Sequence, residues 1–112
     1  MSGIDPKDRP LDFEAQNRAV LLASSGRPKQ SNALLEQLIQ KLPDISELRS
    51  SLGLNLQRLG RHAEAVRAFQ QVVRHSERNA IAHFSLAVSY YQMRQLEPSI
   101  QSLKTALEIE PY

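Results

Sequence analysis

The 112-residue sequence contains no cysteine and no tryptophan, and phenylalanine and tyrosine together supply only six residues. Without cysteine the chain can form no disulfide, can offer no thiolate to a metal ion and has no cysteine nucleophile. This composition fits a reducing compartment. We therefore expect a cytoplasmic protein.

Long apolar runs are also missing. No segment approaches the roughly 20 apolar residues that a transmembrane helix needs, so we expect no membrane span. The first ten residues are polar, contain two prolines and lack the apolar stretch of a signal peptide. We interpret residues 1–10 as a flexible lead-in.

The chain has only a small excess of positive over negative charge. Lysine and arginine number 14 against 12 aspartates and glutamates, which gives a formal net charge of +2. An excess this small does not imply a polyanion as partner. We expect no binding to nucleic acid.

The residue patterns of catalysis and of metal binding are absent as well. The sequence has no Gly-x-Ser-x-Gly elbow, no glycine loop for phosphate and no paired acid motif. The histidines, His62, His75 and His83, are not spaced as a helical metal pair at i and i+4 would be. We therefore expect no enzyme activity, no metal and no cofactor.

What the sequence does contain is a repeat of 34 residues. Gly26 and Gly60 are 34 residues apart, and Pro43 and Pro111 are separated by twice that period. Alignment at this period superposes two sets of small residues and one set of large apolar residues: Ala19, Gly53 and Ala87; Ser31, Ala65 and Ser99; Leu35, Phe69 and Leu103. A repeat of this length is typical of a stacked helical array.

Apolar periodicity and turn residues predict six helices. The first runs from Leu11 to a turn at residues 24–26, and the others cover residues 28–43, 46–59, 62–76, 80–93 and 97–109. We expect Asp12 to cap the first helix, Asp44 and Glu47 to form a capping box at the third, and Asn79 to adopt a left-handed turn before the fifth. Because the loops are short, consecutive helices pack as antiparallel neighbours. The sequence thus predicts an all-α domain over residues 11–112.

The residues at these repeated positions resemble the tetratricopeptide repeat. The middle unit carries the signature most fully and the third repeats it, while the first is more degenerate: Leu52, Gly53, Leu56, Gly60, Ala65, Phe69 and Val72; Leu86, Ala87, Tyr90, Ser99, Leu103, Ala106 and Pro111; Arg18, Ala19, Leu22, Ser31, Leu35, Leu38 and Pro43. The departures are Arg49 and His83 in the tryptophan position, Arg94 for a glycine and Glu77 for the proline. The resemblance implies a right-handed superhelical stack of three hairpins, with repeats at about 12–45, 46–79 and 80–112.

In this family the first helix of each hairpin lines a concave groove in which ligands lie. The resemblance places twelve residues in that lining, of which seven are apolar: Phe13, Gln16, Val20 and Ser24; Glu47, Ser50, Leu54 and Gln57; Ile81, Phe84, Val88 and Tyr91. Such a lining suits an amphipathic helix or an extended peptide. The alternative is that some of these residues pack only within their own hairpin.

The sixth helix carries a second apolar stripe. Ile100, Leu103 and Leu107 follow one another at spacings of three and four residues, and in an interior repeat the next hairpin would cover part of this stripe. We expect either self-association through this end, by a two-fold contact or by exchange of a hairpin, or a chain that is a fragment of a longer one.

Three functions are compatible with these features. The first is a non-catalytic interaction module or scaffold with a protein or peptide partner. The second is the N-terminal region of a larger enzyme, such as a transferase or hydroxylase, that positions substrate or oligomerises. The third is a regulator that contacts nucleic acid through Arg67, Arg74 and Arg78, but the repeat-equivalent positions of Arg67 and Arg74 carry no positive charge, which favours a solvated face.

Overall fold

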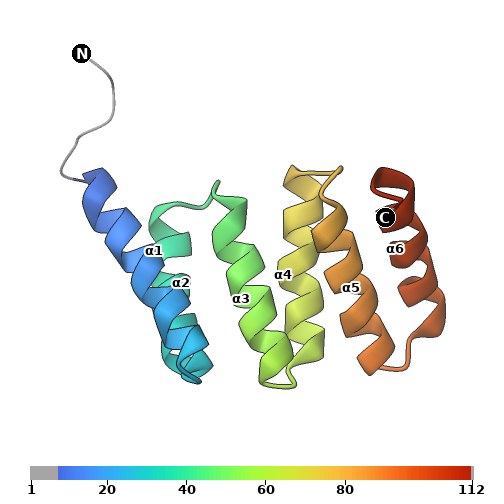
Figure 1. Ribbon diagram of the computed structural model, residues 1–112, viewed down its shortest axis with the longest axis horizontal. Helices are drawn as coiled ribbons and strands as arrows, with labels where there is room; N and C mark the ends of the chain where they lie inside the picture. Colours follow the sequence, from blue (N-terminus) through green and yellow to red (C-terminus); the bar gives the residue numbers. More distant parts are fainter. Residues whose placement is uncertain (1–7, 112) are drawn as a thin grey trace, which may run out of the picture.

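The computed structural model describes residues 8–111, with side chains from residue 14 to residue 111. These residues form six α-helices and no strand: α1 (Asp8–Ser24), α2 (Pro28–Lys41), α3 (Ser46–Arg58), α4 (His62–His75), α5 (Ala80–Gln92) and α6 (Leu96–Ile109). Figure 1 shows consecutive helices paired into hairpins that stand side by side in chain order. The expected all-α stack of three helical hairpins is confirmed.

Each hairpin turns at one residue in the left-handed conformation. Gly26, Gly60 and Arg94 have φ angles of 79°, 78° and 59°, and they are spaced by the 34-residue period. The amide of the following residue bonds back into the helix in all three turns, from Arg27 to Leu22 O, from Arg61 to Leu56 O and from Gln95 to Tyr90 O. This bond is the helix-ending pattern that glycine normally supplies, and Arg94 adopts it without being glycine.

Helices α2, α3, α4 and α5 begin at the expected residues, but the start of α1 and the caps differ from those expected. Because α1 begins at Asp8, Asp12 lies inside the helix and cannot be its cap. The residue that caps α3 is Ile45, which offers no side-chain hydrogen bond, so the capping box of Asp44 and Glu47 is wrong. Asn79 is not left-handed: its φ is −83°, and its side chain accepts a 3.0 Å hydrogen bond from the amide of Ala82 as the cap of α5. Residues 1–7 of the expected lead-in lie outside the described residues.

Small residues let the two helices of a hairpin approach closely. In the middle hairpin a Cβ on Gly53 would lie 2.6 Å from the Phe69 ring, so this crossing has room only for glycine. In the outer hairpins a serine on the second helix reaches across instead. Ser31 Oγ donates to the carbonyl of Ala19 at 2.7 Å, and Ser99 Oγ donates to the carbonyl of Ala87 at 2.8 Å.

The hydrophobic core lies between the hairpins as well as within them. One cluster joins the first two hairpins and the other joins the last two: Ala19, Leu35, Leu38 and Leu48; Leu56, Ala65, Val66, Phe69, Val72, Ala82 and Leu86. Leu52 is partly buried against both clusters. The stack is therefore continuous, with α1, α3 and α5 neighbouring one another along one side.

Candidate functional site

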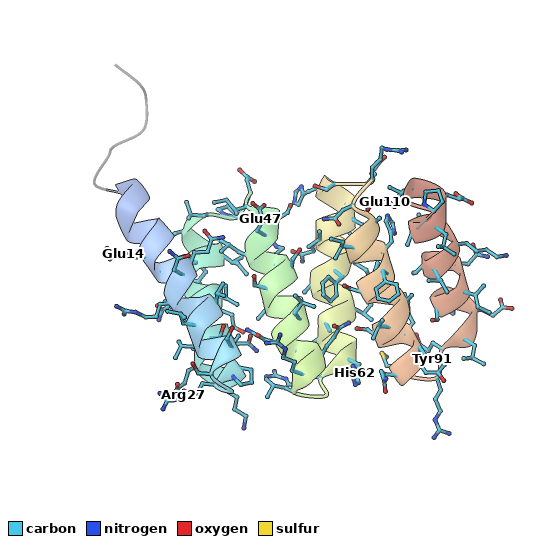
Figure 2. All side chains as sticks on the ribbon, viewed as in Figure 1. Glu14, Arg27, Glu47, His62, Tyr91 and Glu110 are labelled. Atoms are coloured by element: carbon cyan, nitrogen blue, oxygen red, sulfur yellow. The ribbon has the colours of Figure 1, made fainter. Side chains whose placement is uncertain are left out.

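Five of the expected groove residues on α1, α3 and α5 are large, apolar and exposed. The exposed fractions are 52% for Val20, 43% for Leu54, 73% for Ile81, 53% for Phe84 and 63% for Tyr91. We call these residues, together with the half-buried Val88, the first-helix surface. All six are among the expected groove residues, and Figure 2 shows Tyr91 near the C-terminal end of α5.

Helix α5 supplies most of this surface. Ile81, Phe84, Val88 and Tyr91 are separated by three, four and three residues, which places them along one face of the helix. Helices α1 and α3 add one exposed apolar residue each at the same repeat position as Val88, namely Val20 and Leu54. The apolar character of the surface is therefore greatest in the third repeat.

Gln57 closes the space between α3 and α5. Its Nε2 donates to the carbonyl of Ser85 at 2.9 Å and to Oγ of Ser89 at 2.7 Å. Both amide hydrogens are therefore used within the chain, and only the Oε1 atom remains for a ligand. This residue joins two hairpins in addition to any contact with a partner.

Between α1 and α3 the corresponding space is open. The residue that is equivalent to Gln57 in the first repeat is Ala23, which is too short to span the gap. A hollow of about 230 Å³ results, with the following lining: Ala19, Val20, Ala23, Ser24, Ser31, Ser51, Leu54, Asn55 and Arg58. Val20 and Leu54 provide its apolar rim, while Arg58 adds a cation.

The remaining expected groove residues contribute less. Gln16 and Ser50 are half-buried, Ser24 and Glu47 are exposed, and the side chain of Phe13 lies outside the described residues. Sequence reasoning did not identify Arg58 as a lining residue. The 34-residue register could have revealed the hollow itself, because it aligns Ala23 with a glutamine.

The opposite side of the stack is polar and of mixed charge. A hollow of about 450 Å³ between α2 and α4 is lined by carboxylates and guanidinium groups together with apolar stems: Glu36, Ile39, Gln40, Arg49, Leu52, Leu56, Glu64, Arg67, Ala68 and Gln71. Because cations and anions alternate here, they create no field of one sign for a polyanion. Arg67, Arg74 and Arg78 are exposed, as expected of a solvated face.

One ion pair accounts for the titration shifts found among the described side chains. Arg61 donates to Glu64 at 2.7 and 2.6 Å, and this hydrogen bond lowers the pKa of Glu64 and raises the pKa of Arg61. A lowered carboxyl pKa contributes stability that is present at neutral pH and is lost as the pH falls through the folded-state pKa. Since both groups are exposed, this contribution is small.

The described residues do not assemble a catalytic or metal-binding constellation. Within residues 14–111 no group of three His, Asp or Glu side chains is placed to hold a metal ion. His83 Nε2 lies 2.9 Å from the carbonyl oxygen of Glu77, His75 is exposed at the end of α4 and His62 is half-buried at the start of that helix. These positions do not converge on one point.

The expected self-association stripe on α6 is exposed. Ile100 is 51% exposed, Leu103 39% and Leu107 49%. Leu96, which the sequence reasoning did not include, is 57% exposed and lies one turn before Ile100.

A sequence model of the tetratricopeptide repeat matches residues 50–112 of the chain. No curated protein matches the sequence. In the part of the chain that is described, no helix is both long enough and apolar enough to cross a membrane.

Solved structures share the fold. MamA MSR-1 has a TM-score of 0.84 at 24% identity, over 89% of this chain and 57% of that chain. YrrB, described as a TPR protein with an unusual peptide-binding site, has a TM-score of 0.84 at 21% identity, over 97% of this chain and 54% of that one. The CopN-Scc3 complex has a TM-score of 0.86 at 16% identity, over 95% of this chain and 61% of that chain. The chain thus spans little more than half the length of these structures.

Proposed function

The chain belongs to the tetratricopeptide repeat family, and we propose that it is a non-catalytic interaction module whose first-helix surface forms a groove for an apolar helix or extended peptide. The observation that carries this proposal is the exposure of Val20, Leu54, Phe84 and Tyr91 on consecutive first helices. Side chains of this size gain about 25 cal/mol for each Å² of apolar surface that a partner removes from water.

The aromatic residues of α5 are the main contacts in this proposal. Phe84 and Tyr91 are 53% and 63% exposed and lie two helical turns apart, with Val88 between them. Aromatic side chains of this kind dominate binding energy at protein interfaces. A partner helix or strand laid across α5 would cover both rings together with Ile81.

The hollow between α1 and α3 gives the partner a second point of attachment. Its apolar rim of Val20 and Leu54 suits a single aliphatic or aromatic side chain, and Arg58 can pair with a carboxylate beside that side chain. The preferred partner is therefore a peptide that combines several apolar residues with a single acidic one. Peptide binding by YrrB, which has the same fold, supports a peptide as the ligand class.

Selection from a library of displayed peptides tests this function. We expect the full chain to enrich peptides with at least two large apolar residues, and we expect Phe84→Ser and Tyr91→Ser each to weaken the selected peptide at least tenfold. Leu107→Ser is the matched control, because Leu107 is 49% exposed but lies on α6. Equal losses in the control and the α5 variants would contradict the proposal.

A further inference from the structure

The apolar stripe on α6 occupies a face that the stack covers in the other two hairpins. Ile100 is 51% exposed, whereas the repeat-equivalent residues Asn32 and Val66 are 5% and 7% exposed. Leu103 is 39% exposed, whereas Leu35 and Phe69 are 1% and 2% exposed. The stripe on α6 is formed by Leu96, Ile100, Leu103 and Leu107, and its two central residues therefore occupy positions that elsewhere belong to the core.

A helix covers these positions in the first two hairpins. The face of α2 packs against α3, where Leu48 is buried, and the face of α4 packs against α5, where Ala82 and Leu86 are buried. The chemical requirement for covering the α6 stripe is the same, namely a helix that presents an apolar face.

Helix α1 of a second copy does not meet this requirement. Its residues at the positions of the buried faces of α3 and α5 are Glu14, Arg18 and Leu21, and all three are exposed. Stacking of α1 on α6 would bury the carboxylate of Glu14 and the guanidinium of Arg18 against aliphatic side chains, which is costly. Head-to-tail growth of the stack is therefore disfavoured.

Helix α6 of a second copy does meet it. We propose that two copies of the chain associate through their α6 stripes, around a two-fold axis, with the two helices antiparallel. The spacings of four, three and four residues between Leu96, Ile100, Leu103 and Leu107 are those of a coiled-coil seam. In the antiparallel register Ile100 lies opposite Leu103 of the second copy, and Leu96 lies opposite Leu107.

The charges beside the stripe favour this orientation. Glu97 and Lys104 are exposed and lie seven residues apart on the same side of the stripe; Glu108, also on this side, is farther round the helix. Antiparallel pairing brings Lys104 of each copy alongside Glu97 of the other, so the opposite charges meet twice. A parallel pair would instead direct Lys104 toward Ser99 and Ala106.

The size of the stripe sets the strength of the dimer. If each copy buries a patch on the order of a few hundred Å², the area buried by both copies together stays below the roughly 1,200 Å² at which standard interfaces begin. We therefore expect a weak, reversible dimer that is populated at concentrations on the order of 10 to 100 µM. The contact leaves α1, α3 and α5 free, so peptide binding and dimer formation are independent.

Sedimentation equilibrium of the full chain tests the proposal. We expect a monomer–dimer equilibrium that Ile100→Glu shifts at least tenfold toward monomer. The matched control is Leu21→Glu, because Leu21 is 65% exposed on the outer face of α1 and should leave the equilibrium unchanged. Circular dichroism establishes that each variant keeps its helical content.

A charge swap tests the antiparallel orientation. Lys104→Glu should weaken the dimer, because two glutamates then meet on each side, and the double variant Glu97→Lys with Lys104→Glu should restore it. A wild type that stays monomeric at millimolar concentration would overturn the proposal. The proposal would also be overturned if Leu21→Glu weakened the dimer as much as Ile100→Glu does. It would likewise be overturned if the dimer of the double variant remained as weak as that of Lys104→Glu alone.

Discussion

At the scale of single residues, Gly53 and Phe69 form a complementary pair. At the same two repeat positions the outer hairpins carry an alanine and a leucine, Ala19 with Leu35 and Ala87 with Leu103. The middle hairpin has the larger ring and therefore the smaller partner, since a Cβ at position 53 would lie 2.6 Å from the ring. A larger residue at position 53 would crowd the ring, and a smaller residue at position 69 would leave a void beside Gly53.

We predict that Gly53→Ala lowers the free energy of unfolding by about 1 to 2 kcal/mol, because overpacking outweighs the roughly 1 kcal/mol that alanine gains over glycine in a helix. The double variant Gly53→Ala with Phe69→Leu recreates the pair of the outer hairpins and should be more stable than the sum of the two single changes implies. Urea denaturation of all four proteins measures this coupling. Strictly additive changes would show that the two side chains do not compete for the same space.

Asn32 is the least satisfied polar residue of the core. It is 5% exposed, and neither Nδ2 nor Oδ1 has a hydrogen-bond partner among the described residues. The repeat-equivalent residue is the buried Val66. The first interface between hairpins therefore buries an amide where the second buries a valine.

Asn32→Val should raise the free energy of unfolding by about 1 to 2 kcal/mol, because a buried amide without a partner costs this much relative to an apolar group. The reciprocal change, Val66→Asn, is the control and should lower it by a similar or larger amount. Thermal unfolding followed by circular dichroism measures both. A destabilised Asn32→Val variant would show that the amide makes an interaction that this account lacks.

At the scale of helices, the 34-residue period was sufficient to predict which segments pair, because turn residues and small residues both repeat at that spacing. The period also shows how substitutions are accommodated. Arg49 and His83 replace the usual tryptophan, and each hydrogen bonds to a carbonyl six residues earlier, that of Pro43 or that of Glu77. A polar residue is tolerated there because the preceding turn offers an acceptor.

The caps of the helices were predicted less well than their starts. Asp44 precedes α3 by two residues, but the half-buried Ile45 packs against the first cluster and takes the cap position instead. The cap position of α3 is therefore held by a packed isoleucine and not by a carboxylate. Local capping rules contain no information about such tertiary contacts.

One detail of the candidate site was also beyond the sequence. The apolar residues of the first-helix surface follow from the register, but the closure of the α3–α5 gap by Gln57 depends on the length and direction of one side chain. The hollow between α1 and α3 exists because Ala23 has no such reach.

The variant Ala23→Gln tests this explanation at the scale of the element. We predict that the glutamine extends from α1 toward α3, fills the hollow and weakens a peptide that inserts a side chain there by about tenfold, with little change in stability because the site is at the surface. Isothermal titration with a peptide selected by the wild type gives the affinity. An unchanged affinity would show that the peptide does not insert a side chain into the hollow between α1 and α3.

At the scale of the whole molecule, three similar hairpins produce surfaces of different character. The first-helix surface is most apolar in the third repeat, the outer face of α1 is charged and polar apart from Leu21, and the outer face of α6 is apolar. Because each hairpin contacts only its neighbours, a substitution on one surface should leave the others intact. Peptide binding and self-association can therefore be separated by variants in different helices.

The central claim is that α1, α3 and α5 together bind the partner. Amide chemical-shift mapping of the isotope-labelled full chain with a selected peptide tests it most directly. We predict that the largest shifts occur around Val20, Leu54, Phe84 and Tyr91, while residues of α2, α4 and α6 change little. Shifts confined to α2, α4 and α6, with α5 unaffected at saturation, would contradict the account.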